Sequence, residues 1–252
     1  MPSKFVWYEL MTTDLEAAKT FYSSVVGWRA ENFAGASPYV VMNAGDRGVA
    51  GLMTIPEEAK SMGAGPSWLG YIYAPDTDAA TNSVRDAGGK VFREPADIPD
   101  VGRFSVVADP QGAVFMLMTP RGPEQPPVAP STPGHVSWHE LYAADWEKAF
   151  DFYSKQFGWT KDQAMDMGPM GTYQLFSAGG EQIGGMMNKP PAVPMPMWLF
   201  YFNVDALDAA MERVKAGGGQ VMHGPVEVPG GSWIAQCMDP QGAMFALVAQ
   251  RR

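Results

Sequence analysis

The 252-residue sequence has a single cysteine, Cys237, and only three histidines. One cysteine cannot form an intrachain disulfide, so no disulfide framework is possible, and a lone cysteine fits a reducing compartment. We expect Cys237 to be a buried apolar thiol.

Positive charge and long apolar runs are also scarce. The chain has 18 basic and 27 acidic residues, a formal charge of -9, which disfavours binding to nucleic acid or to an anionic membrane. No window approaches the roughly 18 apolar residues of a membrane span, and the opening residues Met1-Pro2-Ser3-Lys4 precede no apolar signal region. The sequence therefore predicts a cytoplasmic protein that handles a small molecule or another protein, with neither nucleic acid nor membrane as partner.

Self-similarity is the most abundant signal in the sequence. Residues 5–28 match residues 136–159 at an offset of 131, and both segments carry the pattern W-x-E-L. The segment DPQGA at 109–113 returns at 239–243, at an offset of 130. Because the offset drifts by only one residue over this distance, the chain is an internal duplication.

The segment between the two copies marks the boundary of the predicted domains. Residues 119–134 contain six prolines, which favour an extended spacer over packed structure. We predict a first domain at residues 1–119, a Pro-rich linker at 120–134 and a second domain at 135–252.

Each copy divides again into two units of one strand, one helix and three strands. In the first unit, Asp14 is the expected N-cap of a helix that Gly27 ends. The predicted elements of the first copy are a strand at 5–11, this helix, strands near 28–34, 38–43, 48–54 and 68–74, a helix at 77–87, and strands near 90–94, 103–108 and 113–119. This βαβββ order excludes a doubly wound parallel sheet, which needs strict alternation of strands and helices.

With the strand-Asp-helix-FY-Gly-Trp opening and the DPxG turn before the last strand, both copies resemble the vicinal oxygen chelate superfamily. This superfamily includes glyoxalase I, bleomycin-resistance proteins and extradiol dioxygenases, and the chain looks like its two-domain glyoxalase-like members. The resemblance implies an α+β fold of tandem glyoxalase-like domains, each with two βαβββ units whose mixed sheets curl around a cleft. It also implies either a monomer with internally paired domains or a homodimer.

Enzymes of this superfamily hold a divalent metal in the cleft, usually with His, Gln and Glu side chains. The places where the resemblance puts these ligands are occupied here by Trp7 and Trp138, by Met116 and Ala246, and by Trp68 or Leu69 and Trp198. None of these side chains is a ligand for a hard cation. We therefore expect no metal site of the usual kind and no cofactor.

Two carboxylates remain as candidate catalytic residues. Glu9 and Glu140 share strand parity with Trp7 and Trp138, so each pair is expected on one face of its strand. A carboxylate among tryptophans can act as a general acid or base, or can anchor a cationic group of a ligand. The alternative is that each Glu only bonds a neighbouring backbone group or Arg. His139 is out of phase with Glu140 and is expected on the opposite face.

Aromatic and methionine residues are the candidate walls of an apolar pocket. The predicted ligand-binding residues are Trp7, Trp138, Trp68, Trp198, Met116, Tyr39 and Tyr173, with Met53, Met187 and Met244 as further candidates. The alternative is that such residues belong to the core. The two DPQGA turns are expected to be structural, with Asp capping the turn and Gly supplying a positive φ.

Three hypotheses for the function follow. The first is a metal-independent protein that binds a small apolar or aromatic molecule, with Glu9 or Glu140 as polar anchor. The second is a metal-dependent lyase, isomerase or dioxygenase with atypical ligands such as Glu9, Glu140 or His139. The third is a regulatory protein whose cleft is filled by its own side chains.

Overall fold

The computed structural model describes residues 3–33, 38–123 and 125–252. The start of the chain at Met1-Pro2, the end of the strand predicted at 28–34 and Glu124 of the predicted linker lie outside these ranges.

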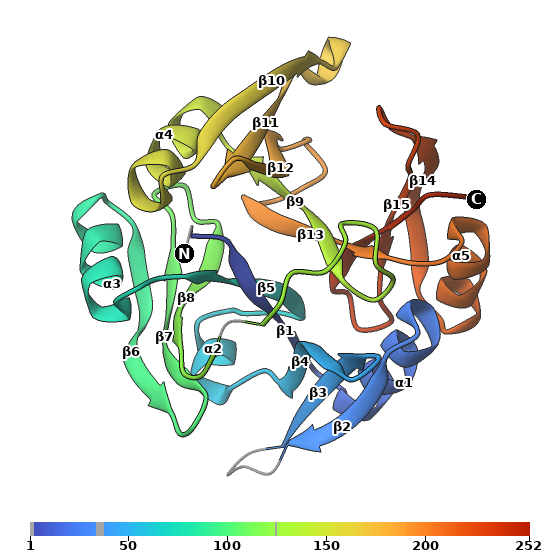
Figure 1. Cartoon of the computed structure of the whole chain (residues 1–252), viewed down its shortest axis with the longest axis horizontal. Coiled ribbons are helices and arrows are strands. Elements are labelled where there is room, and N and C mark those ends of the chain that lie inside the picture. Colours follow the sequence, from blue (N-terminus) through green and yellow to red (C-terminus); the bar gives the residue numbers. More distant parts are fainter. Residues whose placement is uncertain (1–2, 34–37, 124) are drawn as a thin grey trace. The chain divides into compact units, whose positions relative to one another are not determined.

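Both copies follow the predicted order of strands and helices (Figure 1). The first copy forms β1 (Phe5–Thr12), α1 (Leu15–Val26), β2 (Arg29–Phe33), β3 (Tyr39–Ala44), β4 (Arg47–Thr54), α2 (Glu57–Ser61), β5 (Ser67–Tyr73), α3 (Thr77–Asp86), β6 (Lys90–Ile98), β7 (Gly102–Ala108) and β8 (Val114–Pro120). The second copy forms β9 (Val136–Ala143), α4 (Trp146–Phe157), β10 (Thr160–Asp166), η1 (Gly168–Met170), β11 (Thr172–Ala178), β12 (Glu181–Asn188), β13 (Met197–Asn203), α5 (Leu207–Ala216), β14 (Gln220–Glu227), β15 (Trp233–Met238) and β16 (Met244–Ala249). The short helices α2 and η1 are additions to the prediction.

Each copy contributes one mixed eight-stranded sheet. The strand order is β2-β3-β4-β1-β5-β8-β7-β6 in the first copy and β10-β11-β12-β9-β13-β16-β15-β14 in the second. Strand β1 is parallel to β4, whereas β3 and β4 are antiparallel. The two equivalent orders confirm the predicted α+β fold of tandem glyoxalase-like domains.

The helices opening the two copies begin and end where their sequences predict. The Asp14 carboxylate accepts a hydrogen bond from the Ala17 backbone N–H at 3.0 Å, and Gly27 ends the helix with φ 85°. Asp145 and Gly158 have the same roles at the ends of α4. An N-terminal carboxylate satisfies a backbone donor without a helical partner, and glycine takes the left-handed conformation without a side-chain clash.

The chain packs into two compact units, and each unit combines segments of both copies. The first unit contains Met1–Val6, Leu69–Pro126 and Trp138–Leu199. The second unit contains Trp7–Trp68, Pro127–Ser137 and Phe200–Arg252. Helices α3 and α4 therefore lie side by side in the first unit, and α1 and α5 lie side by side in the second (Figure 1).

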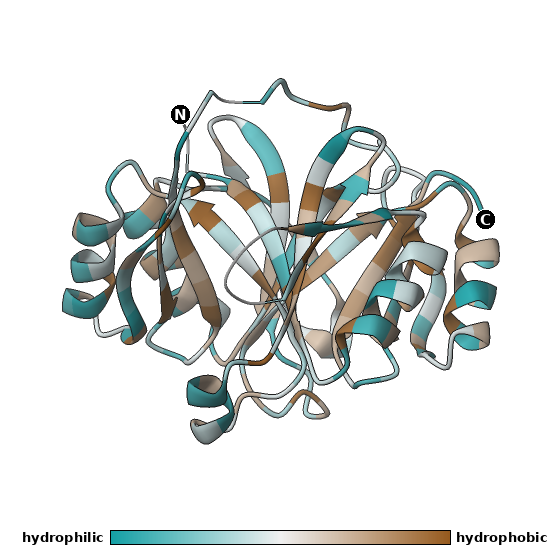
Figure 2. Cartoon of the chain, turned by 90° about the horizontal axis from the view of Figure 1, so that it is seen from below, coloured by the Kyte–Doolittle hydropathy of each residue, from teal (hydrophilic) through white to brown (hydrophobic). Residues whose placement is uncertain are grey.

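Aromatic side chains from both copies form the core of each unit. In the first unit, the ring of Phe115 lies 5.6 Å from that of Tyr153. In the second unit, the rings of Phe21 and Phe245 are 5.8 Å apart. Figure 2 shows brown, hydrophobic stretches along the strands and mostly teal or pale helices, as expected where strands supply most of the buried surface. Across the described ranges, no helix is long and apolar enough to span a membrane.

The DPQGA turns have the structural role predicted for them, and they also contact the opposite copy. Asp109 accepts hydrogen bonds from the backbone N–H groups of Gln111 and Ala113, and Gly112 has φ 99°. The other oxygen of this carboxylate accepts the hydroxyl hydrogen of Tyr153 at 3.2 Å. Each turn thus fastens one copy to the first helix of the other within a unit.

Trp68 and Trp198, predicted to bind a ligand, lie in the hydrophobic core. The Trp198 indole N–H donates to the Tyr153 hydroxyl at 3.0 Å, and Trp198 is 3% exposed. Trp68 donates in the same way to Tyr22, whose hydroxyl donates to Asp239 at 3.1 Å. Both tryptophans are therefore core residues beneath the helices, where each finds a partner for its indole N–H.

The end of the predicted linker is packed rather than extended in solvent. The Trp28 indole N–H donates to the Gly134 carbonyl at 2.7 Å, and the Asn203 side chain donates to the Pro130 carbonyl at 3.0 Å. The prolines restrict the chain, as expected, but tryptophan and asparagine donors fix where it lies.

Candidate ligand-binding site

The two faces of β1 differ near the middle of the strand, where Leu10 is fully buried on one face and Trp7 is half-buried on the other. Leu10 pairs with Leu52 of β4, and both side chains are 0% exposed. Glu9 pairs with Gly51, on the other face of the strand. Trp7 and Tyr39 are half-buried on this second face, as the strand period of two residues predicts for Trp7 and Glu9.

A hydrogen-bonded chain joins Trp7, Tyr39 and Glu9. The Trp7 indole N–H donates to the Tyr39 hydroxyl oxygen at 3.0 Å. The Tyr39 hydroxyl donates in turn to Oε2 of Glu9 at 3.0 Å. This first Trp–Tyr–Glu chain lies within the second unit and fixes two aromatic rings beside one carboxylate.

The second copy contains the same arrangement. The Trp138 indole N–H donates to the Tyr173 hydroxyl at 2.8 Å, and Tyr173 donates to Oε2 of Glu140 at 2.9 Å. This second Trp–Tyr–Glu chain lies within the first unit. The structure thus brings together three of the predicted residues in each copy, with the tyrosine as the bridge.

Glycines on the neighbouring strands β4 and β12 make this geometry possible. A Cβ atom on Gly51 would lie 1.8 Å from the Tyr39 hydroxyl oxygen. A Cβ atom on Gly185 would lie 2.2 Å from Cε1 of Tyr173. Each tyrosine ring therefore packs directly against a glycine in the sheet, a close approach that a larger residue would prevent.

The electrostatics of the two Trp–Tyr–Glu chains keep both tyrosines protonated. Burial, followed by the charge of Glu9, raises the pKa of Tyr39 above its ordinary value. Burial and the charge of Glu140 raise the pKa of Tyr173 in the same way. Each phenol is therefore a stable hydrogen-bond donor to its carboxylate at neutral pH and is unsuited to act as a base.

The surroundings of the two tyrosines differ. Tyr39 pairs across the strands with Phe33, whose ring lies 6.1 Å from that of Tyr39 and which is 44% exposed. Tyr173 pairs with Met165 and is only 8% exposed. The first Trp–Tyr–Glu chain therefore presents an accessible aromatic wall, and the second Trp–Tyr–Glu chain is more deeply buried.

Met116, also predicted to bind a ligand, is 3% exposed on β8 and pairs with Tyr71. It belongs to the first unit, whereas the first Trp–Tyr–Glu chain belongs to the second.

His139 faces away from Glu140, as its strand parity predicts. Its ring stacks on that of Phe5 at 4.3 Å, and its Nδ1 lies 2.6 Å from the Ile183 carbonyl oxygen. Because a carbonyl only accepts, Nδ1 carries the hydrogen. Burial lowers the pKa of His139 to about 4, so the ring is neutral at pH 7. His139 is a core residue and lies on the opposite face of β9 from Glu140.

The residues present do not fit the divalent metal that enzymes of the glyoxalase fold hold. The described part of the chain contains no group of three or more His, Cys, Asp or Glu side chains that could bind a metal ion. Trp7 and Trp138 take part in hydrogen bonds through an indole N–H, which is a donor and not a ligand. Met116 and Ala246 on the closing strands offer no hard oxygen donor.

Comparison with known families agrees with the duplicated fold. The family model described as "Glyoxalase/Bleomycin resistance protein/Dioxygenase superfamily" matches residues 4–117 and again residues 132–247. The chain belongs to this superfamily. Its two matched segments correspond to the two sequence copies.

Similar proteins from other organisms match nearly the whole chain. A protein of Mycobacterium bovis named "Putative glyoxylase CFP32" is 34% identical over 246 residues, covering 96% of this chain and 93% of that protein. The "Anthracycline biosynthesis protein DnrV" of Streptomyces peucetius is 30% identical over 264 residues, covering 99% of this chain and 94% of that protein.

Solved structures show the same fold at lower identity. The Mn(II)-bound glyoxalase from Novosphingobium aromaticivorans matches with a TM-score of 0.68 and 18% identity, covering 99% of this chain and 82% of that one. The 2,2',3-trihydroxybiphenyl 1,2-dioxygenase of Sphingomonas wittichii matches with a TM-score of 0.70 and 14% identity, covering 99% and 91%. These likenesses establish the fold alone.

The sequence pointed to every residue of the two Trp–Tyr–Glu chains but not to the hydrogen bonds that connect them. Tyr39 and Tyr173 were expected only as apolar wall, and the glycines beneath them were not singled out. The signal was present, because Tyr39 and Gly51 recur as Tyr173 and Gly185 at the same offset of 134.

Proposed function

We propose that this glyoxalase-superfamily protein binds a small, planar aromatic molecule against the first Trp–Tyr–Glu chain, without the metal used by enzymes of the superfamily. The observation that carries the proposal is the hydrogen-bonded row of Trp7, Tyr39 and Glu9, with Phe33 beside it. Three aromatic side chains offer a rigid apolar wall, and the carboxylate offers an acceptor for a hydroxyl or cationic group of the ligand.

The relatives favour an aromatic ligand class. The name of the Streptomyces peucetius relative refers to anthracycline biosynthesis. Anthracyclines carry a planar fused-ring system with hydroxyl groups, which suits an aromatic wall beside a hydrogen-bond acceptor. We extend this ligand class to the present chain as part of the proposal.

Titration with a dihydroxyanthraquinone, followed by calorimetry, tests the proposal. We expect saturable binding that weakens about tenfold or more in Trp7→Leu and in Tyr39→Phe, because each loses part of the wall or its alignment. The matched control is Trp233→Leu, which removes a half-buried tryptophan on β15, outside the chain of residues proposed to bind. Equal affinity in Trp7→Leu and wild type would defeat the proposal.

Metal analysis separates this proposal from the enzyme hypothesis. Protein purified without chelator is expected to contain no stoichiometric divalent metal, and EDTA should leave the affinity for the probe unchanged. A stoichiometric metal that is lost on Glu140→Ala would instead support a metal-dependent lyase, isomerase or dioxygenase.

The packing of both copies in each unit supports a monomer with internally paired domains. Sedimentation equilibrium tests this expectation, and a mass of twice the 27.3 kDa chain would favour the homodimer.

A further inference from the structure

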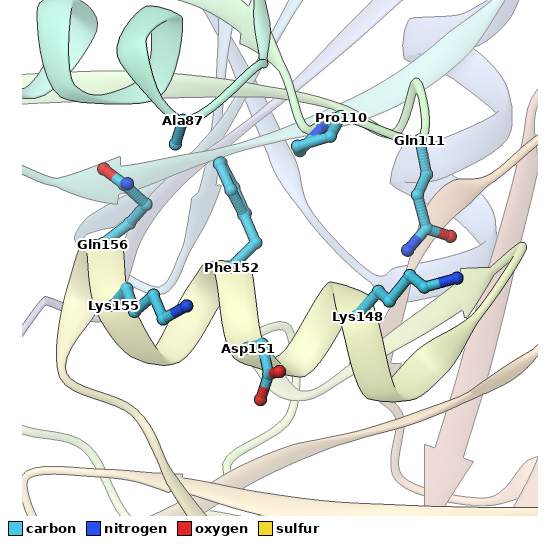
Figure 3. Close-up of a pocket in the computed structure, with 8 residues that line it drawn as sticks. All are labelled: Ala87, Pro110, Gln111, Lys148, Asp151, Phe152, Lys155 and Gln156. Atoms are coloured by element: carbon cyan, nitrogen blue, oxygen red, sulfur yellow. The ribbon is translucent and has the colours of Figure 1, made fainter.

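A groove of about 550 Å³ lies between α4 and the end of α3 in the first unit (Figure 3), and its lining residues do not belong to the second Trp–Tyr–Glu chain. The residues lining it are Ala87, Pro110, Gln111, Lys148, Asp151, Phe152, Lys155 and Gln156. This volume is within the range of pockets that hold small organic molecules.

The groove has an apolar floor and a cationic edge. Phe152, which is 7% exposed, points from α4 toward Ala87 and Pro110 (Figure 3). Lys148 and Lys155 are seven residues apart on α4, so they lie on one side of the helix, about 10 Å apart along its axis. The side chain of Asp151 points away from Ala87 and Pro110 (Figure 3).

The two lysines differ in how they are paired. Lys148 Nζ lies 2.9 Å from Asp145 Oδ2, and this carboxylate raises the pKa of Lys148. Over the described residues, no ion pair or hydrogen bond of the Lys155 ammonium group is observed, and the side chain is exposed. Lys155 is therefore the cation best placed to receive an anionic group, with Lys148 adding positive charge at the other end.

One wall of the groove is held rigidly. The Gln111 side chain donates to the Asp145 carbonyl at 2.8 Å and accepts from the Asp145 backbone N–H at 2.8 Å. This pair of bonds ties the DPQGA turn, including Pro110, to the start of α4. A fixed wall lowers the entropy lost when a ligand binds.

At the equivalent place in the second unit, α5 approaches α1 closely. Gly217 stands where the first unit has Ala87, and a Cβ on Gly217 would lie only 2.8 Å from Cδ2 of Phe21. Arg213 also reaches from α5 to donate to the Val25 carbonyl at 2.9 Å. The duplication therefore allows the two units to be compared. In the second unit, Gly217 and Arg213 bring α5 close to α1, and the first unit has Ala87 at the position of Gly217.

The charged edge is likewise confined to the first unit. Ala17 and Ser24 occupy the positions in α1 that Lys148 and Lys155 occupy in α4. In a chain of net charge -9, two lysines beside an open apolar groove are a local departure from the overall charge.

We propose that this groove binds a small organic anion with an aromatic body, such as an aromatic carboxylate. The ring lies over Phe152 and Pro110, and the carboxylate lies beside Lys155. This site is independent of the function proposed above, because it uses neither Trp–Tyr–Glu chain.

Calorimetric titration with naphthalene-2-carboxylate tests the proposal, with neutral naphthalene-2-carboxamide as matched probe. We expect saturable binding of the carboxylate, and binding about fivefold to tenfold weaker for the carboxamide and for the Lys148→Gln/Lys155→Gln double variant. Ala87→Leu should also weaken binding, because the larger side chain fills the groove.

Two control variants locate the bound probe. Lys215→Gln removes one positive charge from α5, in the other unit, and should leave the affinity unchanged. Trp7→Leu should also leave it unchanged, which separates this site from the aromatic wall of the proposed function. Equal affinity for the two probes, no effect of Ala87→Leu, or an equal loss in Lys215→Gln would overturn the proposal.

Discussion

The buried imidazole of His139 predicts a specific loss of stability in mild acid. The folded protein holds this ring neutral, with a pKa of about 4 against 6.5 for a free histidine, because burial disfavours the charged form. Well above pH 6.5 the ring is neutral in both the folded and the unfolded state, so its protonation does not change the free energy of unfolding. As the pH falls from about 6.5 toward 4, the unfolded chain takes up the proton first, so stability is lost over this window.

The size of the effect follows from the two pKa values. A difference of about 2.5 in pKa, at about 1.4 kcal/mol per unit, gives a total loss of about 3 kcal/mol below pH 4. At pH 5.0 the loss relative to pH 7.5 is about 2 kcal/mol. This is a large share of the free energy of unfolding of an ordinary domain.

Urea unfolding at pH 7.5 and 5.0, followed by circular dichroism, measures this loss. His139→Phe keeps a ring against Phe5 but cannot be protonated, so its free energy of unfolding should fall less between the two pH values, by about 2 kcal/mol. Because wild type and His139→Phe contain the same carboxylates, the difference between their losses excludes the contribution of carboxylates that titrate in the same pH range. His223→Gln, which replaces an exposed histidine, should behave as wild type. Equal losses in His139→Phe and wild type would refute the reasoning.

Three further predictions concern buried groups. Gly51→Ala should lower the free energy of unfolding by about 2 kcal/mol or more, because its methyl group would lie 1.8 Å from the Tyr39 hydroxyl oxygen. Urea unfolding measures this loss, with Gly65→Ala as control, because a methyl group at Gly65 would enter open space. Tyr22→Phe should cost about 1–3 kcal/mol by the same assay, because a buried carboxylate and an indole N–H each lose a partner. Burial raises the pKa of Cys237 to about 12, so iodoacetamide should modify it, as followed by mass spectrometry, only after denaturation.

The predictions that succeeded rest on local chemistry repeated in both copies. Asp14 and Gly27 mark the ends of a helix because a carboxylate cap and a left-handed glycine act within a single turn. Strand parity placed Trp7 beside Glu9 for the same reason, since the period of two residues needs no knowledge of the rest of the fold.

What the sequence did not predict are contacts between segments distant along the chain. Trp68 was predicted to line a ligand pocket, and the structure shows it 4% exposed, with its indole N–H donating to the Tyr22 hydroxyl in α1. Predicting this contact requires knowing which side of β5 the helix covers. The groove beside Lys155 was missed because it forms only where the end of α3 meets α4, which belongs to the other copy.

Each compact unit is built from segments of both copies, so neither copy contains a complete hydrophobic core by itself. The ring of Phe21 packs on that of Phe245, and Tyr22 donates to Asp239, so the first helix of one copy is completed by the last strands of the other. A change on one side of such a contact must be accommodated on the other, which couples the evolution of the two copies. Separated at the linker, the copies would be mutual ligands, each recognising the other through the surfaces that now form the two cores.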